Sequence, residues 1–313
     1  MDASNTKPYH LPADAVWFIT GCSSGIGHSL SQHLARTPHR LVATARKPAS
    51  LSTLPTSPNI LKLGLDVTSL PSIQSAITAT LTQFGRIDVL VNNAGYTLEG
   101  DTEVASDEES RALFDTNFWG MVNLTKPVLG IMREENSRNG GARGGVILNI
   151  SSLGGFIGFP GSAFYHASKF AMEGWTESVA KEMPAEWNIH LCNIEPGGVK
   201  TNYATSSAKM MANGRHPAYA ADPSYPTNML LGYKSRPESR SSWAEPEAVA
   251  GALYRLVSRG ERIPIRVPLG ADSYGMISME VEKIRRELEE LKEISLSVGE
   301  AKQLDSIAFL RKA

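Results

Sequence analysis

Residues 145–169, GVILNISSLGGFIGFPGSAFYHASK, decide the fold of this 313-residue chain. The apolar run 146–150 predicts a buried strand, which breaks at Ser151 and Ser152. A predicted helix then carries Tyr165 and Lys169. Residues four apart lie on one face of a helix, so we expect the phenol and the ammonium to be neighbours.

That pairing has a chemical use. A free tyrosine titrates near pH ~10 and is a poor acid or base at neutral pH. A close positive charge favours the phenolate and lowers its pKa, toward the range where proton transfer to a substrate oxygen is efficient. Ser152, at the end of the predicted strand, is placed to hold that oxygen by a hydrogen bond.

The composition excludes several classes of protein. Lys and Arg number 31 against 32 acids, a net charge of -1, so there is no basic field for nucleic acid. Cys22 and Cys192 are the only cysteines, which supports neither a disulfide framework nor a zinc site. Residues 1–12 are polar and lack the apolar core of a signal peptide, and no apolar run approaches the ~20 residues of a membrane span. We expect a cytoplasmic, metal-free protein.

The first predicted strand, 15–20, runs into a glycine-rich turn and a helix at 28–35. Glycines let a backbone approach a pyrophosphate, and a helix N-terminus favours its negative charge. The spacing is TGxxxGxG rather than the commoner GxGxxG, so the turn alone is also consistent with a tight connection that binds nothing.

The strand predicted at 41–44 is followed by Arg46 and Lys47 and by no acid. A cofactor with a free ribose hydroxyl calls for a carboxylate here, whereas a 2′-phosphate calls for an arginine. The sequence therefore predicts NADP(H), with ordinary solvated charges as the alternative.

Two further strands, 60–65 and 87–91, end at polar residues. Asp66 follows the first and either accepts a hydrogen bond from an adenine amine or caps the helix that includes 73–84. Asn92, Asn93, Ala94 and Gly95 follow the second, at the sheet edge where ligands bind in open α/β sheets.

The next predicted helix, 107–129, contains Asn117, a poor helix former that is either functional or solvent-facing. Phe118 and Trp119 are expected in the core, and 134–145 is expected to be an exposed loop.

The remainder of the chain is expected to complete the fold. Helices are predicted at 167–181 and 245–258, and strands at 189–194 and 263–267. Residues 202–243 lack periodicity and are expected to form a substrate-binding lid. Its adaptable apolar inner surface would comprise Tyr203, Met210, Met211, Tyr219 and Tyr225. An amphipathic helix, 276–294, either packs on the domain, covers the cleft or meets a partner subunit; its apolar side comprises Val281, Ile284, Leu288 and Leu291.

Alternating strands and helices predict a single-domain Rossmann fold. We expect a doubly wound parallel sheet of about seven strands with helices on both faces. A tail at 1–14 would precede the domain at 15–270, and a helical extension at 271–313 would follow it.

TGxxxGxG at 20–27, NNAG at 92–95, Asn117, Ser152 and YxxxK at 165–169 occur in one order and spacing. With them the chain resembles the short-chain dehydrogenase/reductase family from about residue 15 to 269. It is similar to the NADP(H)-preferring branch of hydroxysteroid and retinol dehydrogenases and to fungal biosynthetic reductases of that kind.

The resemblance implies a role for each matching residue. Tyr165 would be the general acid or base, Lys169 would lower its pKa and hold the nicotinamide ribose, Ser152 would orient the carbonyl and Asn117 would hold a water of the proton relay. The pyrophosphate would lie against Thr20, Gly21, Ser23, Ser24, Gly25, Ile26 and Gly27. The 2′-phosphate would meet Arg46, and the adenosine would meet Asp66, Val67, Asn93, Ala94 and Gly95. The nicotinamide would be flanked by Pro196, Gly197, Val199 and Thr201. The family commonly forms homodimers and homotetramers.

These expectations point to an NADPH-dependent carbonyl reductase or alcohol dehydrogenase. Its substrate would be a hydrophobic ketone, aldehyde or alcohol resembling a steroid, retinoid or secondary metabolite. Two alternatives remain: an NADP(H)-binding member that catalyses a net non-redox step, such as cyclisation or isomerisation, and a non-catalytic NADP(H)-sensing protein. An intact Ser152, Tyr165 and Lys169 argues against both.

Overall fold

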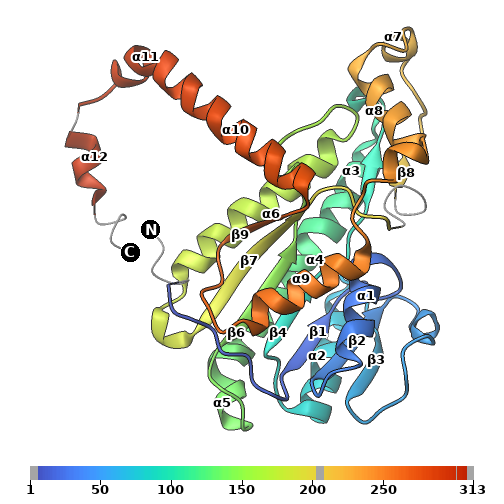
Figure 1. Ribbon diagram of the computed structural model, residues 1–313, viewed down its shortest axis with the longest axis vertical. Helices are drawn as coiled ribbons and strands as arrows, with labels where there is room; N and C mark the ends of the chain where they lie inside the picture. The colour runs from blue at the N-terminus through green and yellow to red at the C-terminus, as the bar shows by residue number, and fades with distance from the viewer. Residues whose placement is uncertain (1–5, 202–207, 301, 309–313) are drawn as a thin grey trace.

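The computed structural model describes residues 6–201, 208–300 and 302–308. Its centre is a seven-stranded, all-parallel sheet in the order β3-β2-β1-β4-β6-β7-β9 (Figure 1). The strands are β1 (Val16–Ile19), β2 (Arg40–Ala45), β3 (Ile60–Gly64), β4 (Val89–Asn92), β6 (Gly145–Ile150), β7 (Ile189–Pro196) and β9 (Arg266–Leu269). The predicted doubly wound Rossmann sheet is confirmed, and the strand order reverses direction between β1 and β4.

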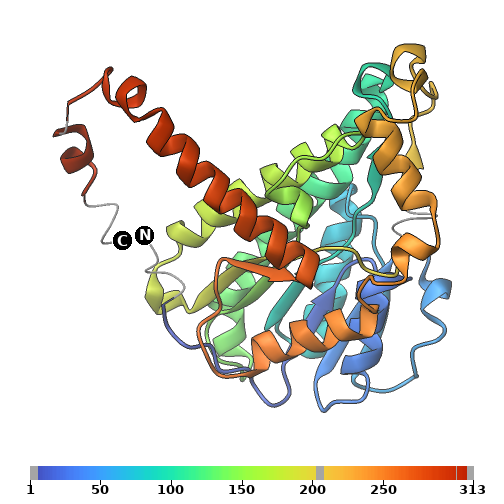
Figure 2. The same cartoon turned by 45° about the horizontal axis from the view of Figure 1, so that its top comes forward.

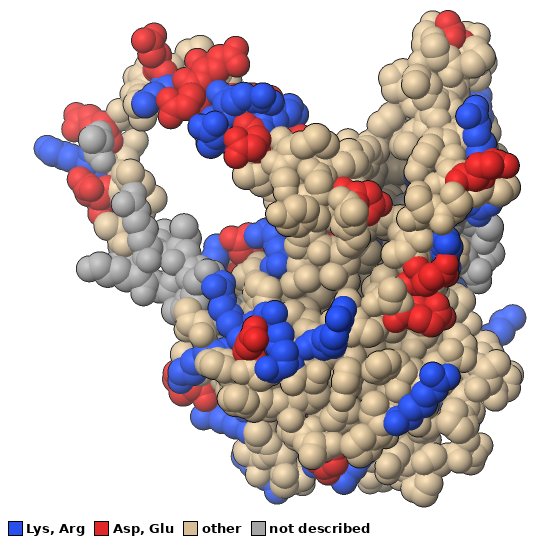
Figure 3. Space-filling view, viewed as in Figure 1, with Lys and Arg blue, Asp and Glu red and all other residues tan. Residues whose placement is uncertain are grey.

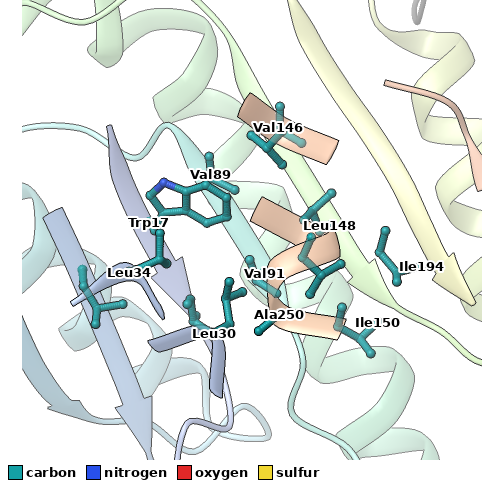
Figure 4. Close-up of a cluster of buried hydrophobic side chains, with 14 of the residues drawn as sticks. Trp17, Leu30, Leu34, Val89, Val91, Val146, Leu148, Ile150, Ile194 and Ala250 are labelled. Atoms are coloured by element: carbon teal, nitrogen blue, oxygen red, sulfur yellow. The ribbon is translucent and has the colours of Figure 1, made fainter. Parts of the chain in front are cut away.

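Helices cover both faces of this sheet because successive strand residues point to opposite sides. On one face, Leu30 and Leu34 of α1 (Gly25–Leu34) and Ala250 of α9 (Pro246–Ser258) pack against the strands. Figure 4 shows these side chains gathered around Trp17, Val91 and Leu148. The other face is covered by α2 (Leu70–Phe84), α4 (Gly120–Gly130) and α6 (Ala163–Glu182). The two apolar layers hold the carboxyl ends of the strands in one row.

The chain from Asp107 to Arg138 is a nearly continuous helix, longer than predicted. It comprises α3 (Asp107–Phe114), a π-helical turn η3 (Asp115–Trp119), α4, a second π-helical turn η4 (Ile131–Glu135) and α5 (Asn136–Arg138). The prediction of an exposed loop over 134–145 is therefore wrong in its first part. Asn136 is fully buried, and its amide exchanges hydrogen bonds with the backbone N–H and C=O of Ile87 at 3.1 and 2.8 Å.

The prediction that Trp119 lies in the core is also wrong, because its side chain is 50% exposed. Phe118 is partly buried against Met121, Val122 and Met172, as expected. The π-helical turn inserts an extra residue into this part of the helix and so rotates the faces that precede and follow it.

The N-terminal segment belongs to the domain from Tyr9 onward. Tyr9 is buried in the core, its N–H donates to the carbonyl of Glu261 at 3.1 Å, and Pro8 forms an isolated bridge with Arg262. The segment predicted as a tail thus packs against the loop that leads into β9.

The region predicted as a lid has secondary structure in its described part, residues 208–243. Strand β8 (Ala208–Met210) pairs in parallel with β5 (Thr97–Glu99), and α8 (Pro226–Ser235) follows. Tyr203 lies outside the described residues. The short elements elsewhere are η1 (Pro48–Leu51), η2 (Thr102–Val104), η5 (Leu153–Gly155), η6 (Ala185–Trp187), α7 (Pro217–Ala220), η8 (Glu238–Arg240), α11 (Lys292–Leu296) and α12 (Lys302–Ser306).

The long helix α10 (Ala271–Glu290) starts at the carboxyl end of β9 and projects away from the sheet (Figure 2). Within the part of the chain that has been described, no helix is long and apolar enough to cross a lipid bilayer.

Candidate active site

A cavity of about 940 Å³ opens at the carboxyl ends of the strands. It is lined by residues that directly follow β1, β2, β3, β4 and β6 and by the end of β7, which is the edge where open α/β sheets bind ligands. Of the predicted site residues, the lining includes Thr20, Gly21, Ser23, Ser24, Gly25, Ile26, Arg46, Asp66, Val67, Asn93, Ala94, Gly95, Ser152, Tyr165, Lys169, Pro196, Gly197, Val199 and Thr201. Of the predicted site residues, Gly27 and Asn117 do not line the cavity, and both contact residues that do.

The glycine-rich turn is locked to the end of β4. Thr20 Oγ1 accepts the backbone N–H groups of Asn93 and Ala94, each at 2.9 Å, and Asn93 Nδ2 donates to the carbonyls of Thr20 and Gly21 at 2.9 and 3.1 Å. A Cβ on Gly27 would lie 2.5 Å from Asn93 Nδ2 and 2.6 Å from the Gly21 carbonyl oxygen. No side chain fits at Gly27, so α1 begins directly against the turn.

The N-terminus of α1 has its backbone donors available for an anion. The Ser24 side chain makes no capping hydrogen bond, and the first turn contains no acidic residue. Unpaired N–H groups and the helix dipole together favour a phosphate at this position. The turn therefore has the features of a pyrophosphate cradle and not only those of a tight connection.

Arg46 and Asp66 line the cavity where β2 and β3 end. Arg46 directly follows β2, is exposed, and has no carboxylate beside it in the sequence. Asp66 Oδ1 accepts the backbone N–H of Thr68 at 2.9 Å and its hydroxyl at 2.7 Å. These bonds are the main cause of the lowered pKa of Asp66, and the charge of Arg46 contributes less. Ser69, not Asp66, caps α2.

Tyr165 and Lys169 lie one turn apart on α6, and both are nearly buried, at 6% and 5% exposure. Lys169 Nζ lies 5.8 Å from the centroid of the Tyr165 ring and donates to the carbonyl of Ile150 at 2.7 Å. Burial lowers the pKa of Lys169 to about 8, and the charge of Glu173 opposes this. The ammonium is held against the end of β6, beside the phenol ring.

Ser152 follows β6, and its hydroxyl accepts the backbone N–H of Gly154 at 3.0 Å. This bond uses a lone pair of the oxygen and leaves the hydroxyl proton to be donated. Since Ser152 lines the same cavity as Tyr165, the two hydroxyl groups can approach one ligand oxygen.

Asn117 is fully buried in the π-helical turn η3 and does not face solvent. Its Oδ1 accepts the N–H of Tyr96 at 3.0 Å, and its Nδ2 donates to the Tyr96 carbonyl at 2.9 Å and to Ser168 Oγ at 3.2 Å. Both amide hydrogens are used in these bonds. The side chain therefore fixes the loop after β4 to α6, and a relay water would need another group of this residue.

The loop after β7 is held by a residue that the sequence did not single out. Asp272 Oδ2 accepts the backbone N–H of Gly198 at 2.7 Å, and a Cβ on Gly197 would overlap the Asp272 carboxylate. The bridge between Val199 and Ala244 fixes the loop on its other side. The one sequence signal for this contact is that Asp272 lies shortly after the last predicted strand.

The apolar wall of the cavity was only partly predicted. Met210, Tyr219 and Tyr225 are exposed and do not line the cavity, and Met211 is buried against Leu98, so their predicted place on the inner surface is wrong. The apolar wall comprises Phe159, Leu230, Tyr233, Trp243 and Met276.

Three further residues of the cavity lining, Lys234, Lys209 and His166, were not predicted from the sequence. Lys234 of α8 pairs with Glu99 of β5 at 2.7 Å, and Lys209 Nζ lies 4.3 Å from the centroid of the Tyr96 ring. His166, which also lines the cavity, has its pKa lowered to about 4 by burial and is neutral at pH 7.

Comparison with known proteins gives a consistent family. The model of the short chain dehydrogenase family matches residues 15–212. The oxidoreductase calM of Penicillium decumbens is 48% identical over 301 residues, covering 94% of this chain and 96% of that one. Retinol dehydrogenase 8 of Bos taurus is 34% identical, with 79% of each chain covered.

Solved structures agree. A short-chain dehydrogenase from Streptomyces avermitilis has a TM-score of 0.79 and 32% identity, covering 92% of this chain and 99% of that one. A 3-ketoacyl-(acyl-carrier-protein) reductase from Brucella melitensis, complexed with NADH, has a TM-score of 0.64 and 23% identity, covering 82% and 98%. At that identity the second likeness extends to the fold alone.

Proposed function

This chain belongs to the short-chain dehydrogenase/reductase family, and from that premise we propose that it is an NADP(H)-dependent oxidoreductase. It interconverts a ketone or aldehyde and its alcohol on a hydrophobic small molecule. The observation that carries the proposal is the convergence of Tyr165, Lys169 and Ser152 on one cavity, with the lysine ammonium buried beside the tyrosine ring.

Tyr165, Lys169 and Ser152 each have a separate role in the proton transfer. Tyr165 donates its phenolic proton to the carbonyl oxygen in reduction and accepts it back in oxidation. The Lys169 ammonium stabilises the phenolate that remains. Ser152 donates a hydrogen bond to the same oxygen and stabilises the charge that develops there. Asn117 acts as a positioning residue through its bonds to Tyr96 and Ser168.

A nicotinamide cofactor, when bound, supplies or accepts the hydride. The residues present fit such a group, because Gly27 leaves no room for a side chain and Ser24 makes no side-chain cap bond to the first N–H groups of α1. The pyrophosphate would be held by the turn that starts at Thr20, the adenosine by the segments that start at Asp66 and Asn93, and the nicotinamide by the segment from Pro196 to Thr201.

The preference for NADP(H) rests on Arg46. It is the first residue after β2, it lines the cavity, and no carboxylate stands beside it to bind a free ribose hydroxyl. An exposed guanidinium at this place can bind a 2′-phosphate through two parallel hydrogen bonds.

The hydrophobic substrate class is supported by the wall of Phe159, Leu230, Tyr233, Trp243 and Met276. An apolar wall opposite a few polar groups is the usual composition of a small-molecule site. The cytoplasm is the compartment we propose, because both cysteines are free thiols.

The test is NADPH consumption, followed by absorbance, over a panel of hydrophobic ketones and aldehydes. We expect turnover with bulky apolar substrates and little with small polar ones. Tight NADPH binding without turnover on any of them would instead favour the non-redox alternative.

A further inference from the structure

Among the described residues, helix α10 contacts the domain at its start. Asp272 binds the backbone of Gly198, Ser273 Oγ donates to the carbonyl of Glu195 at 2.7 Å, and Met276 lines the cavity. Beyond this first part the helix extends away from the sheet in both views (Figure 1, Figure 2). Every residue from Val281 to Glu290 is exposed.

The projecting part carries an apolar stripe. Val281, Ile284, Leu288 and Leu291 are 47, 41, 65 and 50% exposed. Together with Ile277, they are spaced four, three, four and three residues apart, which is the a and d pattern of a coiled coil with Val281 and Leu288 at a. An isolated amphipathic helix cannot bury such an apolar stripe by itself in water. We therefore expect a second structural element to cover the stripe.

The charges beside the stripe identify that element. Glu280 and Glu287 occupy g positions of α10, and Arg285 occupies the e position that lies within the helix, which ends at Glu290. In a parallel pair of identical helices, Glu280 meets Arg285 of the partner subunit, and by symmetry Arg285 meets Glu280 of the partner subunit. In an antiparallel pair g faces g and e faces e, so like charges meet.

The same side chains make only weak contacts within their own helix. Lys283 lies 3.1 Å from Glu280 and 3.9 Å from Glu287, and Arg285 lies 3.1 Å from Glu282. Exposed pairs of this kind contribute little to stability and are readily exchanged for contacts across an interface. Figure 3 shows acidic and basic side chains mixed along the projecting helix.

We propose that α10 is a homodimerisation helix, whose residues 277–290 form a short parallel, in-register coiled coil with the same segment of a second copy of this chain. The helix is already folded on its anchor, so association does not include the unfavourable nucleation of a helix. Two heptads make a short interface, so the contact is concentration-dependent. The proposal does not depend on the proposed catalytic function.

Cysteine cross-linking tests the register directly. Both native cysteines are fully buried, so a cysteine placed on α10 is the reactive thiol of the described surface. A parallel, in-register pair brings position 288 against itself. We expect Leu288→Cys to give a disulfide-linked dimer on a non-reducing gel, and Val281→Cys to do the same. The control is Arg286→Cys, at the f position on the opposite side, which should stay monomeric.

Charge reversal tests whether the partner is a second, parallel copy of α10. In the Leu288→Cys background, Glu280→Lys replaces two symmetric attractions by repulsions and should slow disulfide linkage on the order of tenfold. Adding Arg285→Glu restores the attraction and should restore the rate. Equal linkage of the 288 and 286 variants would overturn the proposal. So would linkage found only in a mixture of Val281→Cys and Leu291→Cys, since that result indicates an antiparallel pair.

Discussion

Lys169 Nζ lies 5.8 Å from the centroid of the Tyr165 ring while it donates to the carbonyl of Ile150. Lys169 and Tyr165 both lie on α6, and the hydrogen bond to Ile150 ties the lysine to the end of β6. The fold therefore sets the distance between the ammonium and the phenol. Burial destabilises the charged lysine and lowers its pKa to about 8. A group that is destabilised in this way gains from a nearby anion, and the Tyr165 phenolate is one.

The cofactor preference is tested by Arg46→Asp. Loss of a charge-assisted bond and repulsion of the 2′-phosphate should weaken NADPH binding by roughly 10- to 150-fold, with little effect on NADH. Lys47→Asp is the matched control, because Lys47 is the exposed neighbour that does not line the cavity. Dissociation constants from quenching of protein fluorescence give the answer, and an equal loss for both cofactors would contradict the assignment.

The phosphate cradle is tested by Gly27→Ala. The added Cβ would overlap the Asn93 amide and the Gly21 carbonyl, so α1 must move away from the turn. We expect a stability loss of about 1–3 kcal/mol and weaker binding of both nicotinamide cofactors. Gly251→Ala in α9 is the control: open space surrounds that position, so stability should rise by about 0.5–1 kcal/mol with binding unchanged. Unchanged cofactor affinity in Gly27→Ala would count against the cradle.

A pH dependence of stability is expected from Glu195, which is buried beside Glu173 and Arg266. Burial, with a smaller contribution from the charge of Glu173, raises the pKa of Glu195 to about 8. Between about pH 4.5 and 8 the unfolded chain has lost this proton and the folded chain keeps it, so stability falls as pH rises through this window.

Glu195→Gln should remove this fall of stability with pH. A single group of this kind contributes a slope of at most about 1.4 kcal/mol per pH unit. Glu177→Gln is the control, because Glu177 also pairs with Arg266 but its hydrogen bonds lower its pKa. Urea unfolding at several pH values measures both variants. An unchanged slope in Glu195→Gln, with the control behaving as expected, would show that Glu195 is ionised in the folded protein.

The sheet could be predicted from the sequence because buried parallel strands are continuous apolar runs followed by glycine or polar residues. Val89, Leu90 and Val91 illustrate this, since all are buried and they alternate between the two apolar layers. The residues at the ends of such strands could be placed in one cavity for the same reason.

Side-chain environments that depend on distant segments could not be predicted. Trp119 is exposed because a π-helical turn rotates it, and no local pattern announces that turn. Asn136 looked like part of a polar loop, yet its amide pairs with the backbone of Ile87, 49 residues away. Asp272 accepts a hydrogen bond from Gly198, which is 74 residues away in the sequence. Trp243 lines the cavity because of the path that the chain takes before α9.

The most direct test of the central claim is the comparison of Tyr165→Phe with the wild-type protein in a single NADPH oxidation assay. The phenylalanine keeps the ring beside Lys169 and removes the hydroxyl group whose proton the mechanism transfers. We predict that kcat falls by about 10²–10⁴-fold while the affinity for NADPH stays within about threefold. Turnover within tenfold of the wild type would contradict the role of Tyr165 as the acid and base of this site.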